Sequence, residues 1–315
     1  MERTANAALW RLLLAFAAVY TIWGSTYLAI YYAVGTLPPF LMGGARFIIA
    51  GVILFMVARA RGAVMPTRRH WRSAMVVGAL LLLGGNGGVM FAEQYVPSGL
   101  ASLMVAAMPL WVVVLDWLRP GGKRPSLLIA FGVLLGTLGI FVLVDPTAVL
   151  NGQSFAPIGI LALMISTFCW ASGSLYSRQA ALPASPLMST AAQMLSGGLL
   201  MTIVGTVTGE WPRLDLAQVS SESWLAFFYL IVFGSIIGFT SYIYLLNNTT
   251  PARAVTYAYV NPVVAVFLGW AIAGETITDR TILAAAIIIG AVVIINTYRS
   301  AQQARPVPRV RAAPS

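Results

Sequence analysis

Long apolar runs separated by short polar stretches fill the chain. The runs are about 20 residues long, enough for a helix to cross a hydrocarbon core of roughly 30 Å. Strands of alternating polarity do not occur, so helices must satisfy the backbone inside the membrane. We expect an all-α polytopic membrane protein with ten transmembrane helices. The predicted spans are 9–33, 38–59, 71–92, 97–119, 126–145, 155–178, 187–208, 223–247, 252–274 and 280–298.

The sequence also repeats itself at a nearly constant spacing. Trp71, Pro109 and Trp117 recur 153 residues later, and an earlier set recurs after 147. That earlier set pairs Trp23 with Trp170, Ser25 with Ser172, Pro39 with Pro186 and Gly51 with Gly198. Each half holds five predicted spans, an odd number, so the second half must be inverted relative to the first. Inverted repeats around a midplane site are typical of secondary transporters.

The repeat and the polar ends predict the domain organisation. We expect a cytoplasmic N-terminus at 1–8, a first five-helix repeat at 9–147 and a second, inverted repeat at 155–298. Residues 299–315, rich in Pro, Arg and Ala, are predicted to form a disordered basic cytoplasmic tail.

The net charge of +10 follows the predicted topology. Basic residues concentrate at both ends of the chain and in alternate loops, and most acids lie on the other side. Because Lys/Arg-rich short loops stay cytoplasmic, both termini are predicted to be cytoplasmic, in a cell inner membrane. This distribution indicates contact with a lipid bilayer and gives no support to a nucleic-acid partner.

Composition argues against an enzyme. The chain has one histidine, His70, and one cysteine, Cys169, too few for a metal-ligand cluster. It contains neither a GxSxG nor an HExxH motif, and no polar stretch is long enough for an ATP-binding domain. We expect no catalytic residues, no metal and no cofactor, and a membrane enzyme is disfavoured.

Few ionisable residues lie at membrane depth, where each is a functional candidate. Arg46 is about eight residues into the second span, and its repeat mate is Gln193. It either binds a substrate carboxylate or bridges to Glu93 or to helix-end carbonyls. Asp116 is expected to pair locally with Arg119. For Glu275 we expect a packing or capping role.

Two equivalent prolines, Pro109 and Pro262, fall at the centres of spans four and nine. Proline lacks the N–H and clashes with the preceding turn, so each helix is predicted to kink. The two kinks either form a hinge beside a polar cavity or only shape helix packing.

Polar and aromatic side chains gather at the same depth. Deep Trp and Tyr residues need a hydrogen-bond partner, so they either lock helices together or line a wet pocket. The candidate substrate-binding residues are Trp23, Tyr27, Arg46, Asn86, Trp170, Ser172, Tyr176, Tyr242, Tyr259 and Asn261.

Several motifs resemble the drug/metabolite transporter superfamily, EamA branch, over residues 9–298. They are Trp23-Gly24-Ser25-Thr26-Tyr27, Pro38-Pro39 through Arg46-Phe47, Pro97-Ser98-Gly99 after Glu93, Tyr257-Ala258-Tyr259-Val260-Asn261-Pro262-Val263 and Gly274-Glu275-Thr276. The resemblance extends to YddG-like amino-acid exporters. It implies that helices one to four and six to nine surround a central cavity, with helices five and ten at the periphery. The first half departs from this pattern with Gly121-Gly122 in place of Gly274-Glu275.

These features favour a secondary transporter that exports amino acids, aromatic or otherwise neutral, or similar small metabolites by alternating access. Multidrug or quaternary-cation efflux is the alternative. A structural membrane protein would not explain paired midplane prolines with polar neighbours. The expected partners are a small-molecule substrate and the bilayer, and glycine faces on the peripheral helices permit a homodimer.

Overall fold

A computed structural model describes residues 2–119, 124–145, 156–249 and 256–303. Within these ranges nine helices are long and apolar enough to cross a membrane, and a tenth, Tyr257–Ala273, is shorter. The described residues contain no strand. Each of the ten predicted spans contains a helix, and the all-α membrane fold is confirmed.

Ten spans are built from more than ten helical segments. The first half comprises α1 (Glu2–Val34), α2 (Pro39–Ala60), α3 (Arg68–Val77), η1 (Gly78–Gly87), α4 (Gly88–Ala92), α5 (Ser98–Ala106), α6 (Met108–Leu118) and α7 (Leu127–Val144). The second half comprises α9 (Pro157–Ser177), α10 (Pro186–Val207), η2 (Trp211–Arg213), α11 (Ser221–Tyr229), η3 (Leu230–Ile237), α12 (Gly238–Asn248), α14 (Tyr257–Ala273) and α15 (Asp279–Gln303).

Some boundaries differ from those expected. Helix α1 already begins at Glu2, and α15 continues to Gln303, beyond the predicted end at 298. The first residues predicted for spans six and nine, 155 and 252–255, lie outside the described residues, as do 304–315 of the predicted tail.

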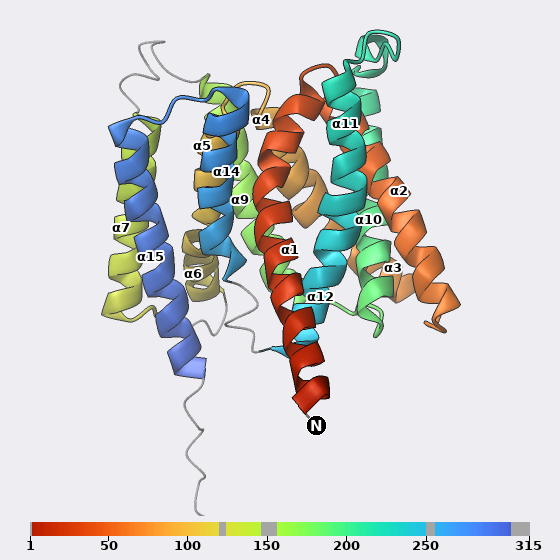
Figure 1. Cartoon of the computed structure of the whole chain (residues 1–315), viewed down its shortest axis with the longest axis horizontal. Coiled ribbons are helices and arrows are strands. Elements are labelled where there is room, and N and C mark those ends of the chain that lie inside the picture. The colour runs from red at the N-terminus through yellow and green to blue at the C-terminus, as the bar shows by residue number, and fades with distance from the viewer. Residues whose placement is uncertain (1, 120–123, 146–155, 250–255, 304–315) are drawn as a thin grey trace, which may run out of the picture.

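The first residues of α1 and the last residues of α15 lie at the same end of the bundle, called here the terminal end (Figure 1). The other end is called the opposite end. There the C-terminus of α1 meets the N-terminus of α11, where Ser223 Oγ donates to the carbonyl of Tyr32 at 2.7 Å. The first and last described residues of the chain therefore lie on the same side of the bundle.

Helix packing follows the internal repeat. Helix α2 packs along its repeat mate α10, and α7 packs along its mate α15. Helix α9 packs against η1, as α1 packs against α11, η3 and α12. Gly62 and Gly209, 147 residues apart, both adopt positive φ, 82° and 74°, where their helices end. Since the two helix ends share this left-handed glycine, the repeat extends to local backbone geometry.

Spans three and eight are not α-helical throughout, which the hydropathy pattern did not indicate. Each contains a π-helical stretch, η1 in span three and η3 in span eight. Gly84, Gly85 and Gly87 surround Asn86 within η1, and Gly234 lies within η3. Where the hydrogen-bond register changes, carbonyls near the change become available to outside donors. The carbonyl of Gly85 accepts from Ser166 Oγ at 2.6 Å, and that of Gly234 from Trp23 Nε1 at 3.2 Å.

Two helix N-termini of the first half are capped by carboxylates of the second half. Glu210 accepts from the amides of Phe40 and Leu41 at 3.2 and 2.8 Å, at the start of α2. Neither α2 nor α5 has a side-chain cap of its own. These caps use charge-assisted hydrogen bonds and the positive end of each helix dipole.

The second cap lies at the start of α5. Glu275 accepts from the amide and hydroxyl of Ser98, both at 2.7 Å, and from the amide of Gly99 at 3.0 Å. The expected capping role of Glu275 is confirmed. By the repeat spacings, Ala63 and Gly122 stand where the second half has Glu210 and Glu275. The chain therefore carries these caps at the opposite end and has no repeat-related carboxylates for the terminal end.

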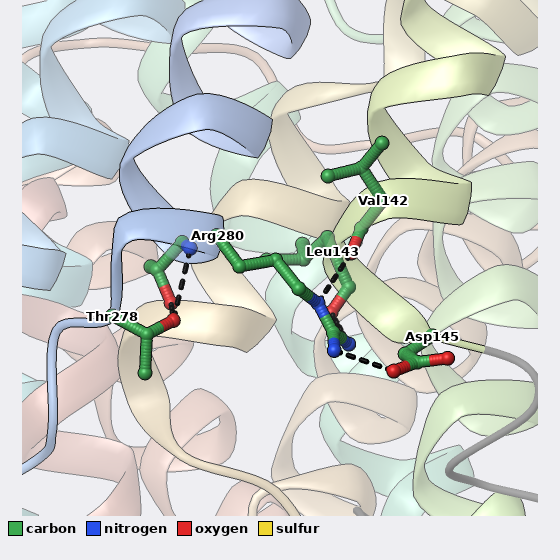
Figure 2. A network of polar contacts seen from close by, with 6 residues as sticks. Val142, Leu143, Asp145, Thr278 and Arg280 are labelled. Carbon is green, nitrogen blue, oxygen red and sulfur yellow. Dashed lines mark hydrogen bonds and ion pairs between the residues drawn. The ribbon is translucent and has the colours of Figure 1, made fainter.

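Helices α7 and α15 form a pair at the edge of the bundle (Figure 1). Arg280 joins them: it donates to the carbonyls of Val142 and Leu143 at 2.7 and 3.3 Å and pairs with Asp145 at 2.6 Å (Figure 2). A cation at a helix C-terminus satisfies its last carbonyls and complements the dipole.

A glycine stripe on α7 faces the interior of the same chain. A Cβ on Gly132 or Gly139 would lie 2.8 Å from Ile295 or 2.7 Å from Ile288 of α15. Close approach of two helices needs such small residues. Helix α15 therefore occupies this glycine face, and the predicted homodimer, which no observation tests, would need another surface.

Removing either of the two capping carboxylates, Glu210 or Glu275, should destabilise the fold. We expect Glu210→Ala and Glu275→Ala each to cost about 1–2 kcal/mol, as loss of a helix N-cap does. The apparent unfolding temperature in detergent micelles should fall for both, while Arg213→Ala, at an exposed residue of the same end, should not change it. Equal unfolding temperatures for all three variants would contradict the capping assignment.

The contact between Trp23 and Gly238 gives a second prediction. A Cβ on Gly238 would meet Trp23 Nε1 and lie 2.9 Å from Cδ1, whereas one on Gly290 has nothing within 4 Å. Overpacking of this kind costs about 1–3 kcal/mol. Gly238→Ala should therefore lower the apparent unfolding temperature, and Gly290→Ala, the matched control, should not. If the unfolding temperature fell equally in both variants, the loss of stability would come from replacing a helical glycine and not from the contact with the Trp23 indole.

Candidate substrate site

Arg46 lies where the two halves meet. Its side chain is 3% exposed, and Nε donates to Ser235 Oγ at 2.9 Å. The guanidinium carbon lies 4.7 Å from the ring centre of Phe47. A Cβ on Gly234 would lie 3.1 Å from Nη2, so the glycine makes room for the guanidinium. Nη1 has no hydrogen-bond partner.

The bridge between Arg46 and Glu93, one form of the expected bridging alternative, does not form. Glu93 is 2% exposed, and neither of its carboxylate oxygens makes a hydrogen bond. A buried charge costs free energy unless it is paired. Arg46 is thus a buried cation with one neutral hydroxyl partner and an unused donor, an arrangement suited to binding an anion.

Four aromatic rings form a cluster next to Arg46. The ring centre of Trp23 lies 5.3, 5.2 and 5.0 Å from those of Phe239, Tyr242 and Tyr257, and the two tyrosine rings are 5.6 Å apart. The indole N–H of Trp23 donates to the carbonyl of Gly234, the glycine that faces Arg46. The aromatic cluster and the guanidinium are therefore joined through one turn of η3.

The other half has an equivalent Trp–glycine contact but no arginine at the position that matches Arg46. Trp170 packs on Gly85, where a Cβ would lie 3.2 Å from the indole, as Trp23 packs on Gly238. Gln193, the repeat mate of Arg46, donates to Ser189 Oγ at 3.0 Å on its own helix. The Trp–glycine contacts belong to the shared scaffold, and the cationic site belongs to one half.

Three other predicted residues satisfy themselves locally or face outward. Asn86 Nδ2 donates to the carbonyl of Leu81 at 3.2 Å, and Ser172 Oγ to that of Phe168 at 2.8 Å. Tyr176 is 39% exposed. None of these side chains joins the contacts around Arg46.

The remaining predicted residues differ in their surroundings. Tyr27 packs against the main apolar core, and Tyr259 lies beside Asn296 of the peripheral helix α15. Asn261 is 8% exposed, and its Oδ1 accepts no hydrogen bond. Its carbonyl would lie 3.3 Å from a Cβ on Gly24, so Asn261 is on the part of α14 that meets α1.

The two prolines are not equivalent in structure. Span four is interrupted at Ala107, and Pro109 lies in the first turn of α6, where a missing N–H costs nothing. Helix α14 continues through Pro262. Hence only the first proline accompanies a break in the helix, and the hinge role of both stays a prediction.

Two cavities open between helices near these residues. One of about 450 Å³ lies between α1, α11 and α14, where Ser25 Oγ and the hydroxyl of Tyr229 are 2.6 Å apart. Another of about 340 Å³ borders the break at Ala107, between α5, α6, α7 and α9. Neither is lined by Arg46, so this guanidinium is enclosed in the described state.

Local interactions account for the other ionisable candidates. Asp116 pairs with Arg119 at 2.9 Å, as predicted. His70 is part of a capping box with Thr67 at the start of α3. In the part of the chain that the structure describes, no group of three His, Cys, Asp or Glu residues is placed to hold a metal ion.

Sequence reasoning missed Ser235 and Gly234 as partners of Arg46. The available signal was a small residue and a hydroxyl side by side in the otherwise apolar span eight. Phe239, a member of the aromatic cluster, was missed because one Phe in an apolar helix carries no signal of its own.

Comparisons with known proteins agree with this architecture. The model of the EamA-like transporter family matches residues 9–145 and 157–297, one match in each half. The inner membrane transporter YedA of Escherichia coli K12 is 40% identical over 294 residues, covering 93% of each chain. Protein PecM of Dickeya dadantii is 26% identical over 281 residues, covering 87% of this chain and 89% of PecM.

A solved crystal structure has the same fold. It superposes with a TM-score of 0.62 at 23% sequence identity and covers 94% of this chain and 99% of its own. The family model matches both halves, and a relative is 40% identical along nearly the whole chain. Both findings assign the chain to the same family. The chain is a multi-pass membrane protein that belongs to the EamA-like transporter family, in the drug/metabolite transporter superfamily.

Proposed function

We propose that this protein is an inner-membrane carrier that exports neutral amino acids, or small metabolites with one carboxylate, by alternating access. The names of the relatives support an inner-membrane location, since YedA is named an inner membrane transporter. The basic loops support cytoplasmic termini, and with cytoplasmic termini the opposite end would face the non-cytoplasmic side of the membrane. Export is the direction expected from the resemblance to amino-acid exporters.

One observation carries the choice of substrate class. Arg46 is a buried guanidinium at the junction of the two halves, and Nη1 lacks any hydrogen-bond partner. Guanidinium groups bind carboxylates through paired charge-assisted hydrogen bonds. A substrate carboxylate would supply the missing acceptor, and a single arginine suits one negative charge better than two.

The aromatic cluster supports a substrate with an apolar or aromatic side chain. Trp23 donates to the carbonyl of Gly234, the glycine that faces Arg46, and Tyr242 and Tyr257 pack against Trp23. Aromatic faces stack on apolar side chains and also attract cations. A carboxylate bound at Arg46 would place the rest of an amino acid next to these rings.

The caps at the opposite end support alternating access. Glu210 and Glu275 fasten α2 and α5 of the first half to the second half, so this end is closed in the described state. Opening it requires breaking these caps together with other contacts between the halves, such as Ser223 Oγ to the carbonyl of Tyr32, while the helices themselves stay hydrogen-bonded. We expect the two halves to rock about the Arg46 level, with the break at Ala107 taking up part of the bend.

Quaternary-cation or drug efflux is the second candidate, and the aromatic cluster is the observation that favours it. Aromatic faces are a common means of binding quaternary ammonium groups. Arg46 opposes it, because a buried guanidinium repels a cation at close range. A transport panel with both substrate classes separates the two candidates.

The decisive test is uptake into proteoliposomes of a labelled panel of neutral amino acids, their carboxamides and quaternary ammonium drugs. We expect saturable transport of at least one amino acid and little of its carboxamide. Arg46→Gln should lower kcat/KM by about 30-fold or more, the effect of removing one partner of a buried charge pair. Arg46→Lys should retain part of the activity.

The matched control is Arg69→Gln, at an exposed arginine of α3, which should transport like the parent protein. Saturable drug transport with no amino-acid transport would refute the proposal. So would an Arg46→Gln protein that inserts normally and transports amino acids at the parent rate.

A further inference from the structure

Glu93 is the most unusual carboxyl group in the described part of the chain. It follows Ala92, the last residue of its spanning helix, and caps the C-terminus of α4. It is 2% exposed, and neither Oε1 nor Oε2 has a hydrogen-bond partner. No role assigned above uses this side chain.

A negative charge at this place would be strongly disfavoured. A helix C-terminus carries a partial negative charge, so it repels a carboxylate. Burial without donors adds the cost of desolvation, which in practice is avoided by taking up a proton. Burial and the charge of Glu275 raise the pKa of Glu93 well above its usual range.

Glu275 has the contrary environment. Its carboxylate accepts three hydrogen bonds from Ser98 and Gly99 at the N-terminus of α5, the end of a helix that attracts negative charge. The two carboxyl groups therefore differ in their partners: Glu275 has three hydrogen-bond donors, and Glu93 has none. Glu275 fastens the opposite end, and Glu93 is the carboxyl group whose surroundings leave only a proton to neutralise it.

The other groups facing Glu93 do not supply a cation. The phenol of Tyr27 on α1 lies within reach of its charge. The backbone of Tyr31, also on α1, lowers the pKa of Glu93, but by less than burial and Glu275 raise it. Arg46 on α2 is bonded to Ser235 and forms no ion pair with Glu93. A proton is thus the ligand that the surroundings leave.

The close packing around Glu93 also favours a proton as its ligand. Helix α9 packs along α4 and presents Gly159, Ala162 and Ser166 to it, none of which is titratable. Glu93 lines neither of the two cavities described above. A proton needs no cavity, whereas an ammonium group or a metal ion would need both room and further ligands.

We propose that Glu93 is a proton-binding site that links closure of the opposite end to the uptake of one proton. When Glu275 leaves the N-terminus of α5, that end opens and water reaches Glu93, which releases its proton to water. On closure, a carboxylate oxygen of Glu93 takes a proton from water before the site is sealed. This link operates whether or not the substrate is an amino acid, so it goes beyond the proposed function.

The sign of the pH dependence follows from the two states. The pKa of Glu93 is raised in the closed state and ordinary in the open, hydrated state. Closure is therefore fully favoured below the ordinary carboxyl pKa, and this advantage is lost as pH rises toward the raised value.

The test uses the full-length protein in lipid nanodiscs without substrate. Spin labels at Gln94→Cys and Ile277→Cys, in a Cys169→Ala background, report the distance across the opposite end by pulsed electron paramagnetic resonance. From about pH 8 to about pH 5 the short-distance population should grow in the parent protein. Glu93→Gln should stay at the short distance throughout, and Glu222→Gln, at an exposed acid of the same end, should follow the parent.

Glu93→Ala also removes the charge and guards against a folding defect specific to the glutamine variant; it should show the same loss of pH response. The proposal is overturned if the parent distances do not change with pH, if they lengthen at acid pH, or if both Glu93 variants respond like the parent. Since no substrate is present, a failure of amino-acid transport would leave this result unaffected.

Discussion

The structure depends on one constraint, that buried backbone groups at helix ends and helix breaks must find partners where no water is present. In this chain many of those partners come from the other half. Glu210 and Glu275 cap helices of the first half, Ser166 and Trp23 fill carbonyls exposed by the two π-helical stretches, and Arg280 closes the C-terminus of α7. Each half therefore completes the hydrogen bonding of the other, and the contacts that stabilise the fold are also those that must change if the halves move.

Much of the fold could be predicted from the sequence because it follows from length and periodicity. Apolar runs of membrane length predicted all ten helices, and the spacing of Trp23 and Trp170 revealed the repeat. The π-helical stretches could not be predicted, because hydropathy is the same whether a backbone bonds to the fourth or the fifth residue. The capping of first-half helices by carboxylates of the second half could not be predicted either, apart from a capping role for Glu275. The sequence does not say which helix end an acidic side chain will contact.

The sequence predicted Arg46 of the candidate site, but it did not predict most of the residues that contact Arg46. Arg46 was recognised because a charge at membrane depth is costly wherever it points. Tyr176 and Tyr259 were grouped with it by depth alone, yet one is exposed and the other lies beside α15. Depth follows from counting residues, but the direction of a side chain depends on helix rotation, which packing decides. The same limit hid Ser235, the actual partner of Arg46.

The measurement that tests the central claim most directly is hydrogen–deuterium exchange at the capped helix N-termini, with and without a transported substrate. If the two halves are fastened by Glu210 and Glu275, the amides of Phe40, Leu41, Ser98 and Gly99 exchange slowly in the resting protein. They should lose protection together when substrate drives the cycle. Fast exchange in the resting protein, or loss of protection at one helix without the other, would contradict the account.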